Sequence, residues 1–172
     1  MKPQLKTLMI ALALLGVAST ISVVARAQDS AAVLTGPQLT RVVPAAFYFQ
    51  GQSAPTQMRN SAAARLGTNR LVIVGMVDTS GYSAEIRARY QGFFITDSSI
   101  NVGGETLSTG AYGFGFTNDG KVNIMDIAGN QILSVSTTND KSLRRPRPLM
   151  MSIDGQNVRL YAGRDYVVIG AK

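Results

Sequence analysis

The chain has 172 residues, a formal net charge of +7, and no cysteine, histidine or tryptophan. Without cysteine and histidine, the sequence excludes serine–histidine and cysteine–histidine nucleophiles, the common zinc sites and any disulfide framework. A basic chain favours anionic partners, but part of this charge lies in the first segment.

The first 27 residues have the order of a secretory signal peptide. Lys2 and Lys6 form a charged start, residues 8–24 are an almost unbroken apolar and small-residue run, and Ala25-Arg26-Ala27 is a small-x-small cleavage site. We expect cleavage after Ala27, and therefore an exported protein that is periplasmic or extracellular and has no stable membrane span after cleavage. An uncleaved anchor is the alternative, because a spanning helix needs about 20 apolar residues.

Removal of the signal peptide lowers the charge that remains for function. Lys2, Lys6 and Arg26 leave with it, so that 14 basic and 10 acidic residues remain, a net charge of +4. This value falls short of the clustered basic face of a nucleic-acid-binding protein, so we expect no nucleic-acid partner. We predict a linker over residues 28–40 and a single β-rich domain over residues 41–172.

Short apolar or alternating runs, separated by turn residues, follow one another along this domain. Gly, Asn and Asp occupy the breaks, as in Asn118-Asp119-Gly120, where hairpin turns need a positive φ. The pattern predicts an all-β fold, an antiparallel meander closed as a barrel or a sandwich of about eight to ten strands. The expected strands are 46–50, 70–77, 92–96, 111–116, 121–127, 131–136, 149–153, 158–161 and 166–169.

Two segments are less regular. Ser83 can cap one short helix over residues 84–90, where Glu85 and Arg89 share a face. Residues 61–66 are ambiguous between a helical turn and a strand, and Thr68-Asn69 favours the strand because it resembles a hairpin turn.

The acidic residues offer little catalytic chemistry. Asp78-Thr79-Ser80-Gly81 follows an apolar strand like the aspartic-protease loop, but Ser80 interrupts the motif, and a turn held by Asp78 is the favoured interpretation. A carboxylate-dependent hydrolase would need Asp78, Glu85 and Asp126 to converge, and is the least favoured function. We therefore expect no catalytic residue; because the acids are scattered, we also expect no metal site and no cofactor.

The glycine-rich segment 109–115 alternates glycine with aromatic residues, which predicts a strand rather than a phosphate-binding loop. Tyr112 and Phe114 then share one face, and the glycines on the other face favour close packing over a ligand-binding surface. In the alternative function, a small apolar-ligand carrier, Phe47, Phe49, Tyr112 and Phe114 would line a barrel cavity.

The densest basic run is Arg144-Arg145-Pro146-Arg147-Pro148, whose prolines favour an extended conformation. We expect Arg144, Arg145 and Arg147 to bind an anionic partner, helped by Arg159 and Arg164 from later strands. The leading function is therefore non-catalytic binding, with an anionic polysaccharide or another envelope component as the expected partner.

Three stretches carry a resemblance to known proteins: Val77-Asp78-Thr79-Ser80-Gly81-Tyr82, Arg145-Pro146-Arg147-Pro148-Leu149 and Arg159-Leu160-Tyr161-Ala162-Gly163-Arg164. With them, the mature chain resembles small exported bacterial proteins of unassigned function. The resemblance implies a bacterial envelope setting and no particular activity.

Overall fold

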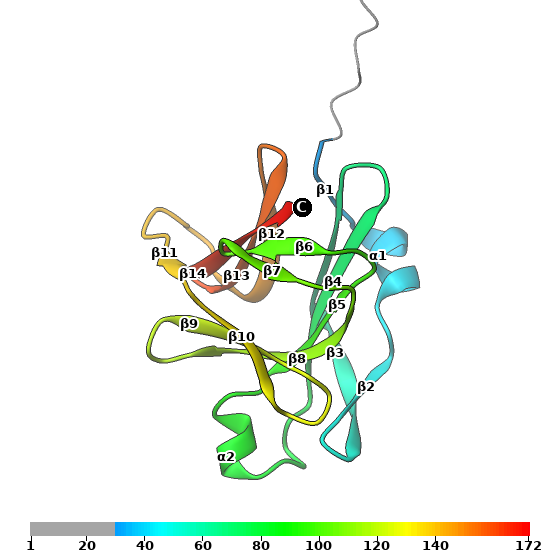
Figure 1. The fold of residues 1–172 in the computed structure, drawn as a ribbon, viewed down its shortest axis with the longest axis vertical. Coiled ribbons are helices and arrows are strands. Elements are labelled where there is room, and N and C mark those ends of the chain that lie inside the picture. Colours follow the sequence, from blue (N-terminus) through cyan, green and yellow to red (C-terminus); the bar gives the residue numbers. More distant parts are fainter. Residues whose placement is uncertain (1–29) are drawn as a thin grey trace, which may run out of the picture.

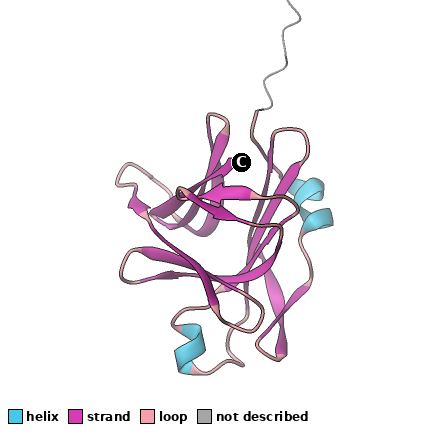
Figure 2. Cartoon of the chain, in the orientation of Figure 1, coloured by secondary structure: helices cyan, strands magenta, loops and turns pink. Residues whose placement is uncertain are grey.

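The computed structural model describes residues 30–172. The predicted signal peptide and its cleavage site lie outside these residues. The described chain forms two antiparallel sheets with two short helices at their margins (Figures 1 and 2). This arrangement is a β-sandwich rather than a closed barrel, and it confirms the predicted all-β class.

The larger sheet has eight strands in the order β1-β3-β4-β5-β8-β9-β10, with β2 paired to β3 beside this path. Consecutive hairpins join β3 to β4 and β8 to β9, as expected for a meander. The strands are β1 (Ala32–Val33), β2 (Ala46–Phe49), β3 (Gln52–Leu66), β4 (Arg70–Val77), β5 (Gly92–Thr96), β8 (Gly110–Thr117), β9 (Lys121–Met125) and β10 (Gln131–Ser136).

The smaller sheet has six strands in the order β12-β13-β14-β6-β7, with β11 paired to β14. The strands are β6 (Ile100–Val102), β7 (Glu105–Leu107), β11 (Thr138–Asn139), β12 (Arg147–Asp154), β13 (Asn157–Gly163) and β14 (Asp165–Ala171). The chain first crosses to the smaller sheet between β5 and β6 and returns between β7 and β8, and it crosses again at Thr137, between β10 and β11.

Two apolar cores lie on opposite faces of the larger sheet. The first fills the space between the sheets and includes Val72, Val74 and Phe114. The second lies on the outer face and includes Ile73 and Phe49, from β4 and β2. Because side chains of a strand alternate between faces, β4 contributes to both cores, which explains its uninterrupted apolar sequence.

The glycines of β8 allow the second core to pack closely, as the sequence predicts. A Cβ atom on Gly113 would lie 2.4 Å from the Phe49 ring, and one on Gly115 would lie 2.2 Å from the carbonyl oxygen of Arg89. Arg89 follows the short helix α2 (Ala84–Arg87), whose predicted cap is confirmed by a 3.3 Å hydrogen bond from the Ile86 N–H to Ser83 Oγ. β2 and the segment after α2 thus pack directly against the glycine face of β8.

The predicted linker over residues 28–40 is wrong where the structure describes it. Ala31 and Leu34 are buried, β1 pairs with β3, and α1 (Gly36–Val42) follows directly. Pro37 stands in the first turn of α1, where its missing N–H costs no intrahelical hydrogen bond. A two-residue strand and a seven-residue helix are too short to produce a periodic signal, so the segment resembles a linker.

No helix within residues 30–172 is long and apolar enough to span a membrane.

Candidate functional site

The predicted arginine site begins in the connection between β11 and β12, which is held in place by Asp140. The Asp140 carboxylate accepts hydrogen bonds from the Ser142 backbone N–H at 2.9 Å, from the Ser142 hydroxyl, and from Tyr161 Oη at 3.0 Å. These donors, above all the Ser142 hydroxyl, lower the pKa of Asp140. The carboxylate therefore anchors the connection and pairs with none of the neighbouring arginines.

Arg164 anchors the same connection from the β13–β14 turn. Its Nη1 donates to the carbonyl oxygens of Lys141, at 3.2 Å, and of Leu143. Nη1 of the guanidinium thus binds backbone carbonyl groups directly before Arg144. Arg164 is therefore a positioning residue for the segment: its Nη1 is engaged by backbone carbonyl groups, while the residue itself is exposed.

Arg159 is also engaged. Its Nε and Nη2 donate to the two carboxylate oxygens of Asp154 at 3.0 and 3.1 Å, and the guanidinium lies 4.8 Å from the centre of the Tyr166 ring. Bidentate pairing and ring stacking suit an arginine that stabilises a sheet surface. Nε and Nη2 of Arg159 are therefore engaged by Asp154 and are not available to an anion in this arrangement.

Arg144, Arg145 and Arg147 differ from these two arginines. All three are exposed, and within residues 30–172 their side chains make no ion pair. Pro146 and Pro148 alternate with them and restrict the backbone. We call residues 144–147 the arginine segment; the structure presents it as a stiff, exposed and uncompensated positive charge.

A groove of about 270 Å³ begins at Arg147 and runs between β12, β3 and the start of α1. Arg59 of β3 lines it together with Arg147, and the half-buried Met150 of β12 adds apolar surface. The pairing of both strands is irregular here, between Thr56 and Ser61 in β3 and between Arg147 and Met150 in β12. Such bulges redirect side chains and are common near functional sites.

Arg59 is the site residue that sequence reasoning missed. It lies in the β3 irregularity, which Gln57 stabilises by donating to the Val77 carbonyl oxygen at 3.0 Å and by accepting from Asn60 at 2.8 Å. The surrounding sequence is polar and shows neither alternation nor a basic run. Arg59 and Arg147 line the same groove because β3 and β12, from different sheets, lie side by side there. No local sequence pattern predicts this proximity.

The three carboxylates of the hydrolase hypothesis serve their own loops or lie exposed. Asp78 accepts from the Ser80 N–H at 3.0 Å, which confirms the predicted turn. Asp126 accepts from the backbone N–H groups of Ala128 and Asn130, both at 2.9 Å. Glu85 is exposed in the first turn of α2. None of these contacts joins one of the three carboxylates to another.

The four aromatic residues of the carrier hypothesis do not surround one cavity. Phe47 and Phe49 belong to the outer core, whereas Phe114 and Tyr112 belong to the core between the sheets. Phe49 and Phe114 are only 1% and 0% exposed, so protein atoms fill the space around them. Among the described residues, no group of three or more acidic side chains could hold a metal ion.

Comparisons of the chain with protein-family models, with curated proteins and with solved structures found no match.

The anchoring role of Asp140 predicts a pH dependence of stability. Because its pKa is lowered in the folded state, the carboxylate contributes stability above its ordinary value of 3.8 and loses that contribution as the pH falls through the folded-state pKa. Asp140→Asn should therefore lower the urea midpoint at neutral pH and weaken its decline in acid. Urea unfolding at a series of pH values measures this. An acid decline as steep in the variant as in the parent would show that Asp140 does not anchor the connection.

Proposed function

We propose that this chain is an exported, non-catalytic binding domain of the bacterial envelope, and that the arginine segment recognises an anionic polysaccharide. The observation that carries the proposal is the contrast among the arginines. Arg159 and Arg164 donate to groups within the chain, whereas Arg144, Arg145 and Arg147 are exposed and unpaired within residues 30–172. The export and the bacterial setting rest on the N-terminal sequence and on the resemblance described above.

The chemistry of the arginine segment suits sulfate and carboxylate groups. A guanidinium presents a planar fork of donors that matches both groups bidentately, and it stays charged at any physiological pH. Three such forks within four residues, in a segment anchored at Asp140 and Arg164, are partly ordered before binding. Ordering of flexible groups opposes association, so a preorganised segment binds more tightly than a mobile one.

The groove adjoins the arginine segment at Arg147, so a polymer bound to the segment can continue into the groove. Arg59 and Arg147 supply charge along it, and Met150 supplies apolar surface. A sugar ring has apolar C–H faces and polar edges, so an anionic polysaccharide matches both features of the groove. The partner would then contact the exposed arginine segment first and continue along the groove.

Retention on an anionic polysaccharide column tests the proposal. Replacing Arg144, Arg145 and Arg147 together by glutamine should elute the protein at clearly lower salt from heparin. At up to about 1 kcal/mol for each exposed ionic contact, we expect the affinity to fall by about 10- to 100-fold. The exchange leaves the two anchors Asp140 and Arg164 in place, so the fold should persist.

A matched variant separates local recognition from total charge. Replacing Arg65, Lys121 and Lys172 by glutamine removes the same three charges from exposed positions elsewhere on the domain. This variant should elute close to the parent protein. If both variants elute together, or if the arginine variant is retained as strongly as the parent, the proposed site is wrong.

A further inference from the structure

Within residues 30–172, four strands form the ends of the main paths of the two sheets, and three of these four are protected against pairing with another strand. β2 and β11 lie beside these paths, and each pairs with one neighbour. β1 has only two residues, and β7 has three and begins at the exposed Glu105. β12 begins between prolines, carries Arg147 and has an irregular register. Short length, charge, proline and bulges are the devices by which proteins block sheet edges.

The fourth end, β10, has little of this protection. From Gln131 to Asn139 the chain contains neither a charged residue nor proline. A register shift at Ile132 interrupts the start of the strand, and this side chain is 53% exposed. From Leu133 to Ser136 the strand is regular, so four uncharged residues form an open edge.

The hydrogen-bond pattern shows which backbone groups this edge offers. The Thr137 N–H donates to the Gly120 carbonyl oxygen at 2.8 Å, so the backbone N–H and C=O groups of residue 137 point toward β9. Along an antiparallel pair, the backbone groups of successive residues point alternately toward the partner strand and away from it. The N–H and C=O groups of Leu133 and Val135 therefore also point toward β9, whereas those of Ser134 and Ser136 point to the free edge. Within the described chain, these four groups have no hydrogen-bond partner.

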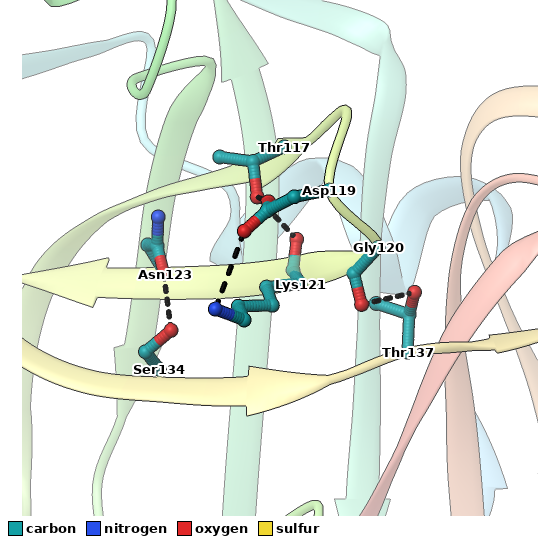
Figure 3. Close-up of polar contacts among 7 residues, drawn as sticks. All are labelled: Thr117, Asp119, Gly120, Lys121, Asn123, Ser134 and Thr137. Atoms are coloured by element: carbon teal, nitrogen blue, oxygen red, sulfur yellow. Dashed lines mark hydrogen bonds and ion pairs between the residues drawn. The ribbon is translucent and has the colours of Figure 1, made fainter.

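Side-chain contacts hold β10 in a fixed position beside β9 (Figure 3). Ser134 Oγ donates to Asn123 Oδ1 at 2.7 Å, and Thr137 Oγ1 donates to the Gly120 carbonyl oxygen at 3.0 Å. In the β8–β9 turn, Asp119 pairs with Lys121 at 3.3 Å. The free edge is therefore preformed, and pairing would require little further ordering.

We propose that β10 is a self-association edge, through which two copies of this chain pair in antiparallel fashion about a two-fold axis at Val135. In this register, Ser134 of one copy lies opposite Ser136 of the other, and the four free groups of each copy form two reciprocal hydrogen-bonded pairs. A two-fold axis places the same surface on both sides of the interface, so a charged edge would repel itself. The uncharged stretch from Gln131 to Asn139 meets this requirement. The inference is independent of the proposed function.

Light scattering coupled to size-exclusion chromatography tests the pairing on the protein purified from its expressing host. The parent should show a concentration-dependent dimer. Ser134→Lys combined with Ser136→Lys places positive charges opposite one another and should give a monomer at the same concentrations. Asn69→Lys combined with Gln156→Lys, two exposed turn positions, adds the same charge elsewhere and should leave the dimer intact.

Charge exchange identifies the register directly. Ser134→Glu combined with Ser136→Glu should also be monomeric, and an equimolar mixture with the lysine variant should restore a dimer. Ser134→Pro gives a second test if the charged variants do not fold, because the Ser134 N–H takes no part in the ladder to β9. A monomeric parent, a dimeric Ser134→Pro or lysine variant, or a mixture that stays monomeric would overturn the proposal.

Discussion

Phe49→Ala should lower the free energy of unfolding by about 3–5 kcal/mol, the usual cost of emptying a buried aromatic site. Phe49 is 1% exposed and stacks on Tyr90 with ring centres 3.9 Å apart and planes at 11°. Its ring also fills the space above Gly113. Loss of the ring removes the contact that joins β2, the end of α2 and the outer face of the larger sheet. Urea unfolding measured by circular dichroism gives the value.

The neighbouring residue Tyr48 provides the control for Phe49. It lies on the opposite face of β2 and is 56% exposed. Tyr48→Ala should change the free energy of unfolding by no more than about 0.5 kcal/mol. If Phe49→Ala changed the free energy of unfolding as little as Tyr48→Ala is expected to, the outer core would not contribute to the stability of the domain.

Gly115→Ala should destabilise the domain by about 1–3 kcal/mol, the range for overpacking a close contact. The added Cβ would lie 2.2 Å from the carbonyl oxygen of Arg89, which belongs to the backbone and cannot rotate away as a side chain could. Either β8 or the segment after α2 must move. Hydrogen bonds that join Gln91 to Phe114 and Phe116 oppose that movement.

Ala111 is the matched position for Gly115, because it lies on the same face of β8 but is exposed. Ala111→Val should leave thermal unfolding nearly unchanged, while Gly115→Ala lowers the midpoint. If Gly115→Ala is as stable as the parent protein, the close approach of α2 to β8 is not a constraint on the fold.

The strands with regular apolar patterns could be predicted from the sequence almost to the residue. The bounds of β4, β5 and β10 agree with the expected ranges, because two buried faces or steady alternation leave a clear signal. The short elements β6, β7 and β11 were missed. They have two or three residues each, and long-range pairing rather than local sequence determines them.

The candidate site is predictable only where its residues form a local sequence pattern. Arg144, Arg145 and Arg147 form a local run, and the structure leaves them exposed. The hydrogen bonds of Arg159 and Arg164 could not be predicted from the local sequence. Their partners, Asp154 and the 140–143 connection, become neighbours only after the hairpins form. The place of Arg59 in the site depends on the contact between the two sheets, and the sequence carries no signal for it.

The salt dependence of heparin binding tests the central claim most directly. Each ionic contact with a polyanion releases about one counterion, which sets the slope of log affinity against log salt concentration. Titration calorimetry of the parent and of the triple glutamine variant at Arg144, Arg145 and Arg147 should give slopes that differ by about two to three. The matched variant at Arg65, Lys121 and Lys172 should keep the parent slope. Equal slopes for the parent and the arginine variant would contradict anion recognition by the arginine segment.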